Sequence, residues 1–222
     1  MNLKKKIVML LLSVILLSDV VHVEGKSLNY FYGHNHFYGY GQDMSEVNYP
    51  DEGMKIVVIS QDIEDLATIL EHLSSDAQIV FFDPLLDTPE EVIEKIVTIS
   101  KLENREISIL AFLGQGQEQG MWIGNQLIHL YNLSNFTAAF TSLKQVLAEG
   151  AYLYFYGSYF QDAEEGGTFL NTLAQLLDAK VYTSVNITGR DGDWVLEIGS
   201  HPEAYAEILD SEALSTAYYY NL

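Results

Sequence analysis

The chain has 222 residues, of which 31 are acidic and 11 are lysine or arginine, so its formal net charge is −20. A surface this acidic repels nucleic acids and anionic membranes, and we expect neither as a partner. The sequence contains no cysteine, which excludes disulfides, cysteine catalysis and a lipid-modified cysteine. A chain of this size buries an adequate core without disulfides, so an extracellular location remains compatible with the composition.

Residues 1–25 have the pattern of a secretory signal peptide. Lysines at positions 4–6 precede an apolar run at 7–17, which is too short for a transmembrane anchor, and residues 23–25 offer a cleavage site after Gly25. Removal of the signal takes away three lysines and two acidic residues, so 8 basic and 29 acidic residues remain and the net charge becomes −21. We therefore expect a protein that is secreted or held at the cell surface, with no membrane span after signal removal.

Three zones follow the signal. Residues 26–54 form a leader rich in tyrosine, glycine, asparagine and histidine, without a helical period. Residues 55–200 alternate between apolar runs and amphipathic segments, and they are expected to form one α/β domain. Residues 201–222 are expected to form a helical C-terminal tail.

The apolar runs of the middle zone predict buried strands at 55–60, 77–83, 106–114, 151–158, 180–186 and 193–199. Helical spacing is found in four sets of apolar residues: Ile63, Leu66, Leu70 and Leu73; Val92, Ile93, Ile96 and Val97; Phe136, Phe140, Leu143 and Leu147; and Phe169, Leu170, Leu173 and Leu177. Strands that alternate with helices predict a mostly parallel sheet covered by helices on both faces.

Two local signals refine this outline. Thr88, Pro89 and Glu91 predict a helix start with a capping box. Gly124 and Asn125 predict the turn of a small β excursion within residues 121–130.

Functional groups in such sheets lie just beyond the carboxyl ends of the strands. The segments "ILAFLGQGQEQGMWIGN", "LYFYGSYFQDAEEGGTFLNTLAQLLDAKV" and "TSVNITGRDGDWVLE" together resemble a caspase-like domain of unknown function, found near the N-termini of large secreted bacterial adhesins and repeat proteins. The resemblance covers roughly residues 55–198. It implies a caspase-like α/β/α sandwich.

In that family the third strand typically ends in Ser-His-Gly and the fourth in Tyr-Gly-Cys, a pair similar to the His/Cys dyad of caspase and gingipain peptidases. The histidine position falls on Leu113 and the cysteine position on Ser158, while Gly114 and Gly157 keep the adjacent glycines. Leucine cannot act as a base, and serine without a base is a weak nucleophile. The resemblance therefore implies a catalytically inactive module in which Gly114 and Gly157 are candidate binding positions. The alternative is a peptidase that uses Ser158 with an unrecognised base.

The other candidate groups are weaker signals. None of the histidines His34, His36, His72, His129 and His201 lies at an expected strand end, so we interpret each as a surface or packing residue. His34 and His36 have the spacing of one strand face, but two ligands are too few to predict a metal site. We expect no cofactor.

Asp191 and Asp193 flank a glycine, as in part of a calcium loop, although the later ligands of an EF-hand are absent. We interpret this segment as a turn that feeds the last strand. The alternative is a calcium-dependent surface adhesion module.

The leader contains an uncharged aromatic segment, residues 28–41. Such segments pair with the sheet edge of a neighbouring subunit. The residues expected to carry assembly are Tyr30, Tyr32, Phe37, Tyr38 and Tyr40. The expected partner is a second copy of the chain, in a homo-oligomer or filament, or a cell-surface molecule. The alternative is a leader that packs on itself or stays disordered.

Overall fold

The computed structural model describes residues 20–21, 53–118, 120–160, 163–200 and 208–222. Apart from Val20 and Val21, the predicted signal peptide and nearly all of the leader lie outside these residues. The same holds for the predicted assembly residues Tyr30, Tyr32, Phe37, Tyr38 and Tyr40 and for His34, His36 and His201.

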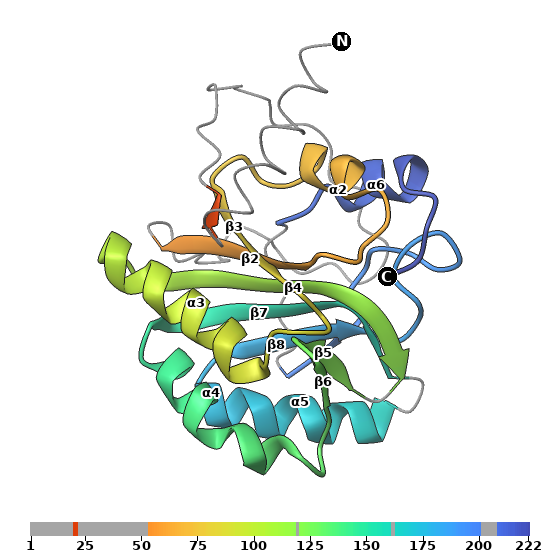
Figure 1. Cartoon of the computed structure of the whole chain (residues 1–222). Helices are drawn as coiled ribbons and strands as arrows, with labels where there is room; N and C mark the ends of the chain where they lie inside the picture. Colours follow the sequence, from red (N-terminus) through yellow and green to blue (C-terminus); the bar gives the residue numbers. More distant parts are fainter. Residues whose placement is uncertain (1–19, 22–52, 119, 161–162, 201–207) are drawn as a thin grey trace, which may run out of the picture.

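A seven-stranded sheet in the order β1–β3–β2–β4–β7–β8–β9 forms the centre of the described structure (Figure 1). Its strands are β1 (Val20–Val21), β2 (Met54–Ser60), β3 (Ala77–Phe82), β4 (Ile107–Glu118), β7 (Leu147–Tyr159), β8 (Lys180–Ser184) and β9 (Ile198–Gly199). The inner strands from β3 to β8 pair in parallel, whereas β1 and β9 pair antiparallel at the two edges. The predicted mostly parallel α/β sheet is confirmed.

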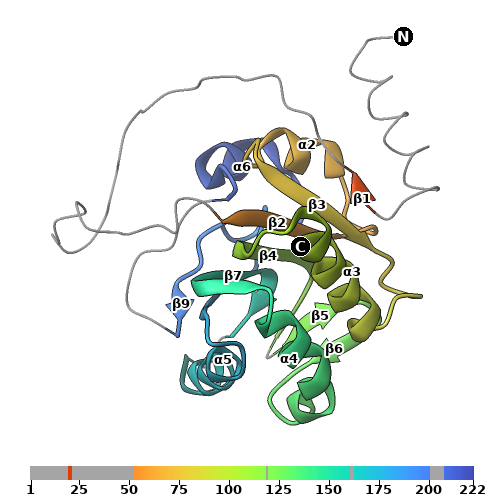
Figure 2. The same cartoon turned by 90° about the vertical axis from the view of Figure 1, so that its left-hand side faces the viewer.

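Helices cover both faces of this sheet, as Figure 2 shows from its end. One face carries α3 (Pro89–Glu103), the 3-10 helix η2 (Leu133–Phe136), α4 (Thr137–Lys144) and α5 (Ala163–Leu177). The other carries α2 (Leu66–Glu71) and α6 (Ser211–Ala217). Among the described residues, no helix combines the length and the apolar character that a membrane crossing requires.

The alternation of side chains along β7 explains why two separate cores form. Successive side chains of a strand point to opposite faces. Leu153 and Phe155 therefore pack toward α3, α4 and α5, while Tyr152, Tyr154 and Tyr156 pack toward α2 and α6. The sheet consequently separates an aliphatic core from a tyrosine-rich core.

Both local predictions are confirmed. The Thr88 side chain accepts a hydrogen bond from the Glu91 N–H, and the Glu91 carboxylate accepts one from the Thr88 N–H, which completes the capping box of α3. Strands β5 (Met121–Ile123) and β6 (Gln126–Ile128) form an antiparallel hairpin around Gly124 and Asn125.

Three predicted boundaries were wrong. Strand β4 continues past Gly114 to Glu118, because its pairing with β7 resumes after a register shift. Leu147 belongs to β7 rather than to the preceding helix, since it pairs with Ile107. The strand expected at 193–199 is reduced to β9, and the residues before it form turns and irregular structure.

The last described segment, residues 208–222, folds back onto the tyrosine-rich core. Leu214, Tyr218 and Leu222 are buried there, and the Tyr218 hydroxyl donates to the Glu64 carbonyl at 2.9 Å. This tail therefore completes a core of the domain, although a boundary after residue 200 had been expected.

Candidate functional site

The topology places the ligand-binding region of an open α/β sheet near the carboxyl ends of β2, β3 and β4. The chain moves from β2 to β3 on one side, and it then returns to place β4 on the other side of β2. Such a reversal leaves a crevice beyond the strand ends, where ligands bind in sheets of this kind.

Leu113 and Ser158 lie on neighbouring strands, but they do not face each other directly. Leu113 is paired with Tyr156 and Ser158 with Gln117, and the register shifts between these two pairs. The Leu113 side chain is fully buried in the tyrosine-rich core, and Ser158 is 5% exposed. The carbonyl of Ser158 accepts a 2.7 Å hydrogen bond from the Thr183 hydroxyl. Both predicted positions are therefore enclosed by packing.

A close backbone crossing explains the glycine at position 157. Gly157 has a φ of +93°, and a Cβ added there would lie 2.0 Å from the Gly114 carbonyl oxygen. Only glycine tolerates both the left-handed backbone and this approach. Gly114 and Gly157 are predicted as candidate binding positions. The geometry gives Gly157 a packing role between β4 and β7, whereas a Cβ on Gly114 would make only ordinary contacts, the nearest at 3.9 Å.

The C-terminal residues close over this crossing. Thr188 connects them: its hydroxyl accepts a 3.0 Å hydrogen bond from the Gly157 N–H, and its carbonyl accepts a 2.9 Å bond from the Leu222 N–H. The Leu222 Cβ lies 3.1 Å from the position that a Cβ on Gly157 would take. The space beside Gly157 is therefore filled by the chain itself.

The two described histidines bond within their own segments. His72 Nδ1 lies 2.7 Å from the Thr68 carbonyl oxygen in α2. His129 Nδ1 accepts a hydrogen bond from the Tyr131 N–H at 3.2 Å. We interpret each of them as a surface or packing residue, and neither lies at a strand end of the central sheet.

A cleft of about 640 Å³ lies at the carboxyl ends of β2, β3 and β4. Its lining residues are Ser60, Gln61, Asp62, Phe82, Asp83, Pro84, Leu85, Gln115 and Trp122. Of these, sequence reasoning had noted only strand ends such as Ser60 and Asp83. Trp122 was missed as a cleft residue, because the hairpin that carries it reaches the strand ends only through the tertiary fold.

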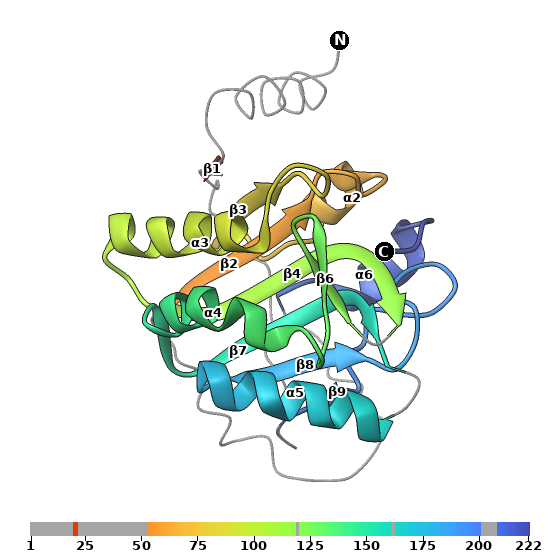
Figure 3. The same ribbon diagram turned by 60° about the horizontal axis from the view of Figure 1, so that its bottom comes forward.

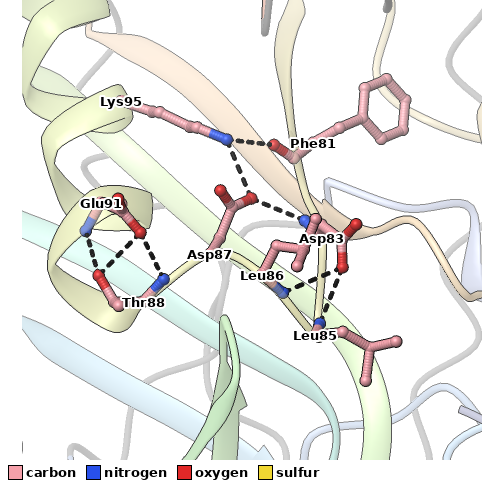
Figure 4. Close-up of polar contacts among 8 residues, drawn as sticks. All are labelled: Phe81, Asp83, Leu85, Leu86, Asp87, Thr88, Glu91 and Lys95. Atoms are coloured by element: carbon pink, nitrogen blue, oxygen red, sulfur yellow. Dashed lines mark hydrogen bonds and ion pairs between the residues drawn. The ribbon is translucent and has the colours of Figure 1, made fainter.

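The loop between β3 and α3 forms one wall of the cleft and is held by polar contacts (Figure 4). The Asp83 carboxylate accepts hydrogen bonds from the Leu85 N–H at 2.8 Å and the Leu86 N–H at 3.2 Å. Asp87 accepts a 2.7 Å bond from the Asp83 N–H and forms a 3.0 Å ion pair with Lys95.

Backbone contacts from the β5–β6 hairpin also support this loop. The Asn125 N–H donates to the Asp87 carbonyl at 2.7 Å, and a Cβ on Gly124 would lie 2.3 Å from that carbonyl oxygen. Despite this fixation, the side chains of Leu85 and Leu86 are 82% and 76% exposed. The loop therefore presents two leucines to solvent on a well-supported backbone.

The acidic turn at 189–193 has protein partners for its carboxylates. Asp191 accepts a 2.7 Å hydrogen bond from the Asn221 side-chain amide, and Asp193 accepts one at 3.1 Å from that of Asn186. In the part of the chain that the structure describes, no group of three or more His, Cys, Asp or Glu residues is arranged to hold a metal ion. The turn attaches the C-terminal segment to the end of β8, and calcium binding stays a prediction.

Comparison with known proteins gives a family but no individual relative. Neither the curated proteins nor the solved structures contain a match to the chain. The model of one family, the domain of unknown function DUF4347, matches residues 56–221, a span that includes both cores and the folded-back tail except for Met54 and Leu222. The chain therefore belongs to the DUF4347 family.

Proposed function

We propose that this protein is a secreted, catalytically inactive caspase-like module with a structural or binding role at the cell surface, and that it assembles through its aromatic leader. The observation that carries the proposal is the enclosed position of Leu113 and Ser158. Leu113 is completely buried, and Leu222 packs beside Gly157.

The strand arrangement supports the caspase-like interpretation. The strands that carry Leu113 and Ser158 are third and fourth in the parallel series, and they are direct neighbours in the sheet. Neighbouring parallel strands would bring a histidine and a cysteine at their carboxyl ends to the same edge of the sheet. The scaffold therefore fits a dyad whose reactive groups have been replaced.

The chemistry of the two positions supports inactivity. A leucine at 113 supplies neither a base nor a proton donor, and its side chain points into the tyrosine-rich core rather than toward a substrate. Ser158 is 5% exposed, so a peptide bond has little access to its hydroxyl. Loss of a catalytic dyad removes several orders of magnitude in rate.

A peptidase assay tests the proposal directly. Protein comprising residues 26–222 should cleave neither a peptide library nor itself. Activity that disappears in a Ser158→Ala variant would establish the peptidase alternative and overturn the proposal. The Leu113→His/Ser158→Cys double variant is informative as a comparison, because activity gained only there would identify the two positions as a degenerate dyad.

The structural role in this proposal is self-assembly through the leader. Residues 28–41 are aromatic and uncharged, in a chain whose net charge is −20. Like-charged copies repel each other, so contact through an uncharged segment has the lowest electrostatic cost. Deletion of residues 26–48 should leave a folded monomer, and light scattering at micromolar concentration compares it with the protein that retains the leader.

A further inference from the structure

We propose that the outer edge of β3, together with Leu85 and Leu86 beyond its carboxyl end, is the surface that receives residues 28–41 of a second copy of this chain. The inference rests on the proposed assembly through the leader, and it names the acceptor for that segment. These residues are called the β3 acceptor surface below.

The edge of β3 is able to accept an added strand. On its inner side β3 pairs with β2 along its whole length, from Ala77 to Phe82. On its outer side, within the described residues, only Val20 and Val21 pair with it, antiparallel to Val80 and Ile79. Backbone groups left unpaired at a sheet edge bind extended segments by strand addition.

Signal removal would open this edge. Val20 and Val21 precede the predicted cleavage after Gly25, so the exported protein would lose the short strand that pairs with β3. The opposite edge of the sheet ends in β9, a strand of two residues that offers little pairing length. The two edges therefore differ, and β3 is the longer acceptor.

The exposed leucines extend this edge with apolar contacts. Leu85 and Leu86 follow the last residue of β3 closely, and both are more than three-quarters exposed. The Asp83 carboxylate and the Asp87–Lys95 ion pair hold their backbone in place. A surface that is already ordered loses little conformational entropy on binding, so such a loop is suited to docking.

The net charge of the chain favours an uncharged segment as the occupant of the β3 acceptor surface. A copy with a net charge of −20 is repelled by another copy unless the contact uses an uncharged segment. Residues 28–41 contain no acidic or basic residue apart from two histidines. Their aromatic side chains can make apolar contacts with the exposed leucines. These 14 residues span roughly 46 Å when extended, more than the roughly 20 Å of a six-residue strand. One segment is therefore long enough to pair with β3 and to reach the leucines.

Solvent-exposed substitutions test the surface without disturbing a core. In protein comprising residues 26–222, Leu85→Ser/Leu86→Ser should weaken self-association at least about tenfold, since two apolar contacts are lost. Leu102→Ser is the matched control, because Leu102 is 79% exposed near the far end of α3, and its association should be unchanged. Sedimentation over a concentration series measures all three proteins, and circular dichroism verifies their folding.

Cross-linking distinguishes the partner copy from the same copy. Because the chain has no cysteine, Leu85→Cys in one tagged population and Tyr38→Cys in another should form a mixed disulfide dimer on oxidation. Leu102→Cys with Tyr38→Cys should not. A Leu85→Cys/Tyr38→Cys double variant that closes only within single chains would show that the leader binds its own domain, and this would overturn the inference.

These experiments distinguish a failure of the β3 acceptor surface from a failure of assembly through the leader. If the protein remains monomeric, or if it assembles equally well without residues 26–48, both assembly through the leader and the β3 acceptor surface are rejected. Assembly that depends on residues 26–48 but is insensitive to Leu85→Ser/Leu86→Ser rejects the β3 acceptor surface alone.

Discussion

The cores on the two faces of the central sheet differ in residue composition. The face under α3, α4 and α5, the helices that lie in front of the sheet in Figure 3, is aliphatic with several phenylalanines. The face under α2 and α6 is rich in tyrosine and contains Trp194. The first is covered mainly by two helices of 15 residues and one of 8. The second has helices of only 6 and 7 residues, so the C-terminal segment must supply part of its cover.

This difference suggests different ways of holding the chain. On the aliphatic face, each helix follows its strand in the sequence and brings its own apolar stripe. On the tyrosine-rich face, Trp194 packs against Tyr156 of β7 and Tyr218 of the tail, at ring-centroid distances of 6.2 and 5.3 Å. Aromatic contacts therefore connect segments that are distant in the sequence, and the tail should be released first when they are lost.

The largest expected loss of stability comes from removing a large side chain from either core, and hydrogen exchange in the tail should distinguish the two cores. Trp194→Ala and Phe140→Ala each remove a large buried side chain, and each should lower the free energy of unfolding by about 3–5 kcal/mol. Only Trp194→Ala should also speed hydrogen exchange at the Leu214 and Tyr218 amides, because Trp194 contacts the tail. Denaturant unfolding and exchange measured by mass spectrometry test both parts. Equal exchange in the two variants would show that the tail does not depend on the tyrosine-rich core.

The glycine crossing should give the next largest effect. Gly157→Ala places a Cβ against the Gly114 carbonyl at a φ of +93°, so destabilisation should exceed about 2 kcal/mol. Gly150→Ala is the matched control, since Gly150 also has a positive φ but its Cβ would meet open space. The control should cost about 1–2 kcal/mol for the left-handed backbone alone. Thermal unfolding of both variants measures the difference, and equal losses would contradict the crossing.

The Tyr218 hydroxyl should couple the tail to pH. Burial, and then the charges of Asp65 and Glu64, raise the pKa of Tyr218 well above its ordinary value of 10.0. Its stabilising contribution is therefore fully present below about pH 10, where the unfolded tyrosine is also protonated, and it is lost as the pH rises from there toward the folded-state pKa.

Tyr218→Phe removes this contribution together with the hydrogen bond to the Glu64 carbonyl. At neutral pH the substitution should cost about 0.5–1.5 kcal/mol. Above about pH 10, the stability of the variant should fall less steeply than that of the unmodified protein. Urea unfolding across the alkaline range checks this, and parallel curves would exclude Tyr218 as the titrating group.

The smallest effect belongs to the aliphatic face and is local. Thr88→Ala removes the cap of α3 and should cost about 1 kcal/mol. Thr98→Ala, at an exposed position within the same helix, should be nearly neutral. Because the buried residues of α3 and those of the tail belong to cores on opposite faces of the sheet, neither variant should change hydrogen exchange at Leu214. A changed exchange rate there would show that the two faces are coupled.

The sequence by itself determined the features that depend on neighbours along the chain. The capping box of α3 needs only Thr88 and Glu91 three residues apart, and the hairpin needs a turn at Gly124 and Asn125. The buried strands appeared as short apolar runs, since both faces of an inner parallel strand are covered. These signals were sufficient for the mostly parallel α/β architecture.

Tertiary structure alone decided the features that depend on pairing across long separations. The extension of β4 and the capture of Leu147 by β7 follow from the β4–β7 register, which local propensity does not encode. The cleft unites residues from three strand ends and the hairpin, and Leu222 reaches Gly157 through Thr188. Contacts of this kind form because packing and backbone hydrogen bonding favour one global arrangement, even where each short segment taken alone would permit several.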